Sequence, residues 1–235
     1  MFRCVLTAIV LMLWSVPGFS QSSAGAGASL ATPFSAAGNE PGWRLDIAEG
    51  RITLLADYGS TKLEMRAGEP QPLPGGRRYA GNADGHVLIV TVLDRLCEDS
   101  MTGMPKPQSV EVTIDEQVLK GCGGDPASLV RGPAWVVEDI DKSGVIERSR
   151  PTLLFDDKGR LSGSASCNTY TASYTIGGEG LAIGKSVSTR KACPPALMTQ
   201  EQAFLAFLEA VDRFEIGGDG ALILHAATRT LRARR

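Results

Sequence analysis

The residues of this chain that could do chemistry begin with its cysteines, of which there are five among 235 residues. A thiolate beside a base is a nucleophile, whereas thiols in an oxidising compartment form disulfides. Cys4 lies within a predicted export signal, so four cysteines remain in the mature chain. Four cysteines allow three pairings. Their spacing favours two local disulfides, Cys97 with Cys122 and Cys167 with Cys193.

Two further patterns suggest nucleophiles, but both favour a structural interpretation. Cys167 is followed by Asn168, yet the chain has only two histidines that could serve as its base, His86 and His225, and His86 is far away in the sequence. The three serines at 162, 164 and 166 alternate along a predicted strand and therefore share one sheet face. They lack the second glycine and the following helix of a G-x-S-x-G nucleophile motif. We therefore expect no catalytic residue and no enzyme activity.

Candidate metal ligands are also few. The chain has no C-x-x-C pair and no paired histidines, which argues against zinc. The segment 139–150 places oxygen ligands and a glycine as an EF-hand loop does, but Arg150 stands where a bidentate glutamate is needed. Glu201 lies on a predicted helix without an evident carboxylate partner. We expect a hairpin turn at 139–150, and neither a metal nor a cofactor.

The N-terminus predicts export. Arg3 precedes the apolar run VLTAIVLMLW, and small residues follow it, so residues 1–20 are predicted to be a signal peptide and residues 21–32 a flexible leader. The apolar run is too short for a comfortable membrane span. We therefore predict a periplasmic or secreted protein whose mature chain has no transmembrane span. A net charge of −2 argues against nucleic acid as a partner.

Two modules are predicted from the pattern of strands and breaks. The N-terminal module, 33–124, has strand-like runs at 43–47, 51–56, 62–66, 87–93, 109–114 and 118–121. Glycine and proline mark a linker at 125–133. The C-terminal module, 134–235, has strand-like runs at 135–140, 152–156, 160–166, 169–176, 181–183, 186–189, 214–216, 221–225 and 230–233.

One helix interrupts the strands of the C-terminal module. Phe204, Phe207, Leu208 and Val211 fall on one face at helical spacing, and prolines at 194 and 195 suit a first turn. A helix with one apolar stripe must cover another element. The predicted fold class is therefore α+β, predominantly antiparallel β, with two small modules, the C-terminal one a curved sheet with one packed helix.

Two segments of the C-terminal module form a recognisable motif. The run LSGSASCNTY at 161–170 has the pattern G-x-x-x-C-N-x-(Y/F), and STRKAC follows at 188–193. In these residues the module resembles the META domain, the family of the heat-shock protein HslJ. The resemblance implies a small α+β fold, an association with envelope stress, and no enzyme activity. It assigns structural roles to the motif residues Trp135, Gly163, Asn168, Tyr170, Thr189, Met198, Glu201 and Phe204.

The N-terminal module contains three motif segments: GNEPGW at 38–43, CEDSMTG at 97–103 and GCG at 121–123. In these segments it resembles an uncharacterised domain found beside META domains in bacterial envelope proteins. Trp43 ends the first segment, and a large aromatic side chain at the start of a module usually fills the core.

Three function hypotheses follow. The leading one is a non-enzymatic exported envelope protein with a binding role or a stress-related maintenance role. Its expected partner is an unknown envelope protein, glycan or lipid. The second is an inhibitor of an envelope-directed enzyme such as lysozyme, because small disulfide-bonded modules are preorganised for binding. The third is an uncharacterised hydrolase, which turnover of a general esterase, peptidase or glycosidase substrate would reveal.

Overall fold

The fold is rich in antiparallel β-structure. A computed structural model describes residues 33–178 and 180–235, so the predicted signal peptide and leader lie outside the described residues. Strands account for 53% and helices for 11%, in one sheet that forms a half-barrel and one that forms a nearly closed barrel. The predicted α+β class, with a packed helix as a defining layer, is therefore wrong. Each sheet encloses apolar side chains largely by curving on itself, so the fold needs no helical layer.

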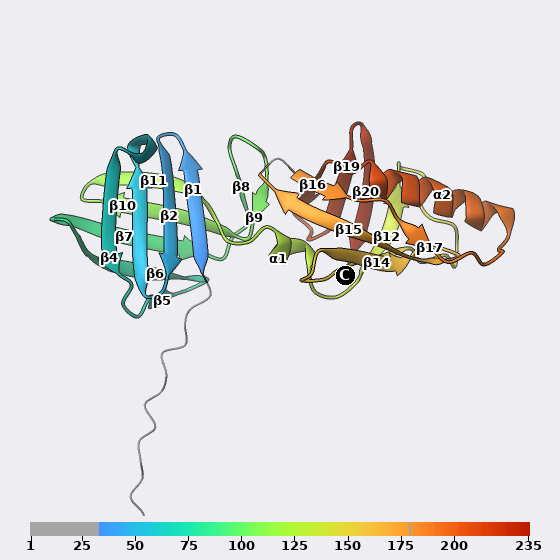
Figure 1. The fold of residues 1–235 in the computed structure, drawn as a ribbon, viewed down its shortest axis with the longest axis horizontal. Coiled ribbons are helices and arrows are strands. Elements are labelled where there is room, and N and C mark those ends of the chain that lie inside the picture. The colour runs from blue at the N-terminus through green and yellow to red at the C-terminus, as the bar shows by residue number, and fades with distance from the viewer. Residues whose placement is uncertain (1–32, 179) are drawn as a thin grey trace, which may run out of the picture. The chain divides into compact units, whose positions relative to one another are not determined.

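The N-terminal sheet contains nine strands in the order β4-β3-β2-β1-β11-β10-β7-β6-β5 (Figure 1). These strands are β1 (Phe34–Asn39), β2 (Gly42–Ala48), β3 (Arg51–Ala56), β4 (Thr61–Arg66), β5 (Gln71–Leu73), β6 (Gly76–Ala83), β7 (His86–Leu93), β10 (Gln108–Ile114) and β11 (Gln117–Gly123). Most neighbours are joined by short turns. There are two exceptions: β7 and β10 are joined by the segment that contains β8 (Cys97–Glu98) and β9 (Pro105–Lys106), and the pairing of β1 with β11 joins the two ends of this stretch of chain.

Alternation along the strands places apolar side chains inside the N-terminal sheet. Leu45 on β2, Leu54 on β3 and Val90 on β7 are fully buried, while their sequence neighbours face outward. The sequence pattern predicted these three strands. It did not predict β1 or β6, whose glycine, alanine, asparagine and arginine residues have low strand propensity. Pairing with β2 and β7 therefore determines these two strands.

The C-terminal sheet follows the order β16-β15-β14-β13-β12-β20-β19-β18, and β17 pairs separately with β15. Its strands are β12 (Trp135–Ile140), β13 (Thr152–Phe155), β14 (Arg160–Ser164), β15 (Thr169–Gly177), β16 (Gly180–Ile183), β17 (Val187–Ser188), β18 (Arg213–Ile216), β19 (Leu222–Ala226) and β20 (Arg229–Arg234). Each lies within or close to a predicted strand. A short helix, α1 (Ala127–Val130), precedes the sheet.

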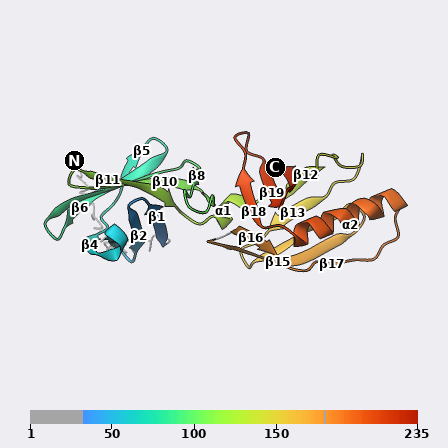
Figure 2. The ribbon, with the colours of Figure 1, turned by 90° about the horizontal axis from the view of Figure 1, so that it is seen from above.

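The longer helix, α2 (Pro195–Glu209), is a single element beside this sheet. It starts with proline at its first position, which fits the helical backbone angle there. Phe204, Phe207 and Leu208 are fully buried. Figure 2 shows α2 running beside β15, and the ring of Phe204 meets that of Tyr170 edge to face at 5.5 Å. No helix among the described residues is long and apolar enough to cross a membrane.

Candidate functional site

Both predicted cysteine pairs are formed. Cys97 is bonded to Cys122 and Cys167 to Cys193, with Cα atoms 5.5 Å and 6.1 Å apart. The first bond joins β8 (Cys97–Glu98) to β11, and the second joins the turn before β15 to the segment before α2. A bonded sulfur is not a nucleophile. The four cysteines within the described residues therefore serve the fold.

Glu201 is the centre of a buried hydrogen-bond network in the C-terminal sheet. It points from α2 toward the start of β15 and is 7% exposed. One carboxylate oxygen accepts hydrogen bonds from the backbone N–H groups of Asn168, at 2.7 Å, and Cys167, at 3.3 Å. The other accepts from the Asn168 side-chain amide at 2.8 Å. The carboxylate therefore holds the turn between β14 and β15 against the helix.

Asn168 extends the same network to the strand that precedes α2. Its side-chain oxygen accepts hydrogen bonds from the Thr189 hydroxyl at 2.8 Å and from the Lys191 backbone N–H at 2.7 Å. The side chains of Asn168, Thr189 and Glu201 thus tie together three segments that the Cys167–Cys193 bond also joins. Carboxylate and amide groups with this many fixed partners stabilise a structure and have little capacity left for a substrate.

The remaining predicted motif residues of this module mostly support its packing. Tyr170 donates a hydrogen bond from its hydroxyl to the Thr152 carbonyl at 2.9 Å, and burial raises the pKa of this phenol far above its usual value. Gly163 is required beside the same carbonyl, because a Cβ there would lie 2.0 Å from the Thr152 oxygen. Met198, on the first turns of α2, is instead 37% exposed.

The side chain of Trp135 packs against Arg235. Its indole N–H donates to the Val130 carbonyl at 2.8 Å, and the guanidinium of Arg235 lies 3.9 Å from the centre of its ring. Arg235 also donates hydrogen bonds to the carbonyls of Val130, Arg131 and Pro133. These contacts hold Arg235 against the start of β12.

We expect Arg235→Gln to lower the free energy of unfolding of the C-terminal sheet by about 1 to 2 kcal/mol, because cation–π and carbonyl contacts are lost. Hydrogen–deuterium exchange of peptides from α1 and β12 would measure this change. Arg213→Gln is the matched control, since Arg213 is exposed and forms no ion pair among the described residues. Equal exchange in the two variants would contradict the structural role of Arg235.

In the segment 139–150, which resembles an EF-hand loop, the carboxylates of Asp139 and Asp141 are engaged in other contacts. Asp139 accepts hydrogen bonds from the backbone N–H groups of Lys142 and Gly144 at 2.8 Å and 2.7 Å. Asp141 pairs instead with Arg229 at 2.6 Å. Across 33–178 and 180–235, no group of three His, Cys, Asp or Glu side chains is placed to hold a metal ion.

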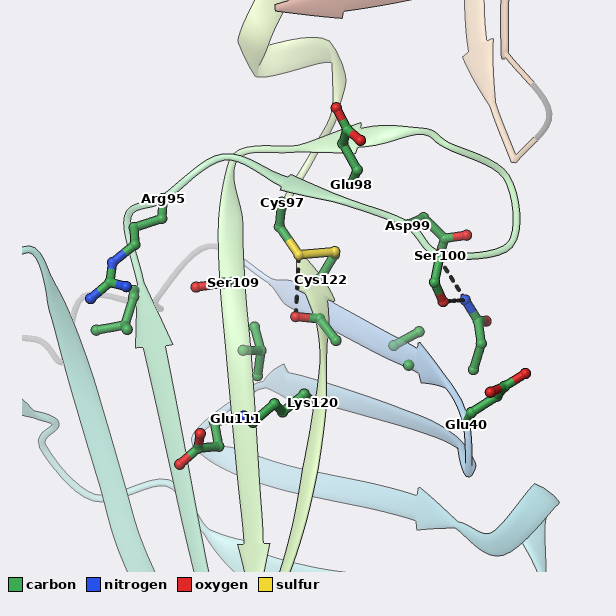
Figure 3. A pocket seen from close by; sticks show the side chains of 16 residues that line it. Glu40, Arg95, Cys97, Glu98, Asp99, Ser100, Ser109, Glu111, Lys120 and Cys122 are labelled. Atoms are coloured by element: carbon green, nitrogen blue, oxygen red, sulfur yellow. Dashed lines mark hydrogen bonds between the residues drawn. A yellow bond between two sulfur atoms is a disulfide. The ribbon is translucent and has the colours of Figure 1, made fainter. Parts of the chain in front are cut away.

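The most distinctive cavity lies on the N-terminal sheet, where the three motif segments of that module meet. A pocket of about 440 Å³ is lined by Gly38 to Glu40, by Cys97 to Ser100, and by Gly121 and Cys122 (Figure 3). Strands β1, β10 and β11 form its floor. The segments 38–43, 97–103 and 121–123 are far apart in the sequence, and the pairing of β1 with β11 brings the first and last together.

Trp43 explains the glycines of the pocket floor. Its indole N–H donates to the Lys120 carbonyl at 3.2 Å, and its ring lies against β1 and β11. A Cβ on Gly38 would lie 2.2 Å from the indole nitrogen, and one on Gly121 would lie 2.1 Å from the Ala37 carbonyl oxygen. Only glycine therefore fits at these two positions. Trp43 itself is 5% exposed and belongs to the core.

A flap, defined here as residues 95–106, forms the wall of the pocket. It contains the two-stranded pair of β8 with β9 (Pro105–Lys106). The Cys97–Cys122 bond anchors it to β11, and the Asn39 side chain donates a hydrogen bond to the Ser100 hydroxyl at 2.9 Å. Figure 3 shows the disulfide at Cys97 and the hydrogen bond at Ser100, further along the same arm of the flap. The flap is therefore fixed at two points of the sheet.

Asp99 stabilises the turn within the flap. Its carboxylate accepts hydrogen bonds from the backbone N–H groups of Met101 and Thr102 and from the Thr102 hydroxyl. Burial raises the pKa of Asp99, but these hydrogen bonds outweigh burial and hold the pKa below its usual value. Asp99 is therefore a structural residue of the pocket wall.

Five other charged side chains of the pocket are not engaged in this way. They are exposed, and within the described residues none of them forms an ion pair or a hydrogen bond: Glu40, Arg95, Glu98, Glu111 and Lys120. This pocket was not predicted from the sequence. The three motif segments that line it are visible in the sequence, but only the tertiary structure shows that they lie close together.

Comparisons with known proteins identify the C-terminal half. Residues 127–235 match the META domain family, and none of the curated proteins matches the chain. An NMR structure of a protein from Burkholderia xenovorans is 25% identical over 47% of this chain and 88% of that one, with a TM-score of 0.38. A second NMR structure is 22% identical over 47% of this chain and 94% of its own, with a TM-score of 0.39.

Proposed function

We propose that this chain, whose residues 127–235 form a META domain, is an exported, non-enzymatic envelope protein that works by binding. In this proposal the META domain is of the HslJ type and is associated with envelope stress. The N-terminal sheet, an envelope-type domain, carries the binding pocket. The partner is an envelope protein, a glycan or a lipid.

One observation carries the proposal, namely the contrast between the two sets of motif residues. The polar groups of the META motif, Asn168, Thr189 and Glu201, are occupied by hydrogen bonds to their own fold. Apart from Asp99, the charged groups of the N-terminal pocket have no such partners among the described residues. Free polar groups around a cavity suit a ligand, whereas fixed ones suit a scaffold.

Location outside the cytoplasm is supported by the disulfides. Two bonds, Cys97–Cys122 and Cys167–Cys193, form and persist in oxidising compartments. The predicted signal peptide at 1–20 would direct the chain there. A periplasmic or secreted location is therefore part of the proposal.

Capture of partners from an envelope extract tests the proposal. The mature chain is immobilised and exposed to extracts from heat-stressed and unstressed cells, and retained proteins, glycans and lipids are identified by mass spectrometry. A pocket variant, Glu40→Gln with Arg95→Gln, is compared with a matched control, Arg66→Gln with Glu69→Gln. Both control residues are exposed and lie outside the pocket lining.

We expect one specific component to be retained by the mature chain and by the control, and to be lost with the pocket variant. No specific retention under either condition would contradict the binding function. Turnover of a general esterase, peptidase or glycosidase substrate that is abolished by Glu201→Gln would overturn the non-enzymatic part of the proposal.

A further inference from the structure

We infer that the pocket of the N-terminal sheet binds a short peptide in its zwitterionic form, with the free carboxylate toward Arg95 and the free ammonium group toward Glu40. This inference rests on the proposed binding function and adds the chemical class of the ligand. It concerns only residues of the N-terminal sheet and its flap.

The first argument is that the free charges that face the cavity are balanced. The lining holds Arg95, Lys120 and four carboxylates. Of these carboxylates, Asp99 is hydrogen-bonded within the flap and Glu98 points away, which leaves Glu40 and Glu111 to face the cavity. Within the described residues, neither these two carboxylates nor Arg95 and Lys120 form an ion pair. An anion alone would be repelled by the carboxylates, and a cation alone by the guanidinium and ammonium groups. A ligand with one charge of each sign can complement both.

The second argument is the separation of the opposite charges. Figure 3 shows Arg95 at one side of the pocket and Glu40 at the other, with Lys120 between them along the floor. Glu98, although it belongs to the lining, points away from the cavity in the same view. Glu111 lies on the Arg95 side in this view and is the cross-strand partner of Lys120, so the charges of these two side chains offset each other. Arg95 and Glu40 remain as opposite charges at the two sides of the pocket, and an extended molecule charged at both ends fits them in one direction.

The third argument concerns the middle of the pocket. The Ser109 hydroxyl lies on the floor and forms no hydrogen bond within the described residues, so it can donate to or accept from an amide. The surrounding floor consists of Leu93, Val110, glycine backbone and the disulfide. A cavity of about 440 Å³ lies in the range of small-ligand sites.

Titration with three matched tripeptides tests the inference. The probes are trialanine, N-acetyl-trialanine, which lacks the ammonium group, and trialanine amide, which lacks the carboxylate. Binding is followed on the full mature chain through the backbone amide signals of Gly38, Gly121 and Ser109 in proton–nitrogen correlation spectra. The unshifted signals of the C-terminal sheet report that each sample is folded.

We expect trialanine to shift these three signals and each capped peptide to bind roughly three- to fivefold more weakly, as one exposed charge pair is lost. Arg95→Gln should weaken trialanine binding by a similar factor and leave the binding of trialanine amide unchanged. Glu40→Gln should show the converse pattern with N-acetyl-trialanine. Arg66→Gln should change none of these affinities.

The absence of shifts in the three pocket signals up to about 10 mM trialanine, or equal binding of all three peptides, would overturn the peptide assignment. This failure is distinguishable from failure of the proposed function. If envelope capture still depends on Glu40 and Arg95, the pocket binds a ligand of another class. If envelope capture also fails, the binding function itself is contradicted.

Discussion

Replacing Glu201 by alanine is expected to destabilise the C-terminal sheet by about 3 to 5 kcal/mol. The substitution removes the acceptor of three hydrogen bonds from the backbone of Cys167 and Asn168 and the Asn168 side chain. Buried donors left without a partner cost about 1 to 3 kcal/mol each, and relaxation of the turn recovers part of this cost. Few single substitutions have an effect of this size.

Hydrogen–deuterium exchange along a urea series would measure the loss, because it reports the free energy of opening for peptides of β15 and α2 separately from those of the N-terminal sheet. Gln202→Ala is the matched control on the same helix, since Gln202 is exposed. A change below about 1 kcal/mol in Glu201→Ala would mean that the network adds little to stability, and the carboxylate would again be a candidate for chemistry.

Replacing both Cys97 and Cys122 by alanine is expected to destabilise the N-terminal sheet by about 3 kcal/mol and to abolish retention by the pocket. The bond closes a loop with a sequence separation of 25, and its loss increases the entropy of the unfolded chain. It also removes one of the two described attachments of the flap, leaving the hydrogen bonds of Asn39. The pocket wall should then be mobile.

The second disulfide provides the control. Alanine at Cys167 and Cys193 removes a bond with a separation of 26, so the cost in stability should be similar but confined to the C-terminal sheet. Exchange of peptides from β8 and β9 should increase only in the first variant. Unchanged exchange of the flap in the Cys97 and Cys122 variant would show that the disulfide does not hold the pocket wall.

Local features of this molecule could be predicted from the sequence. The cysteine pairs are close in the chain, the apolar stripe of α2 repeats at helical spacing, and the strands of the C-terminal sheet alternate or are β-branched. The META motif lies within a short stretch around Cys167 and Cys193, which made it recognisable. Each of these signals arises from residues near one another in sequence, where propensity and periodicity act directly.

Tertiary structure alone determined the fold class, the pocket and the contact between Arg235 and Trp135. Each sheet curves around its own apolar core. This curvature arises from the pairing and twist of several strands, so the sequence of a single strand does not specify it. Gly38, Asp99 and Gly121 meet because Ala37 pairs with Cys122 across the sheet. Strand register over such separations is selected by burial of one face. The sequence thus determined most of the strands, whereas pairing determined β1 and β6, and packing determined which distant side chains face the same cavity.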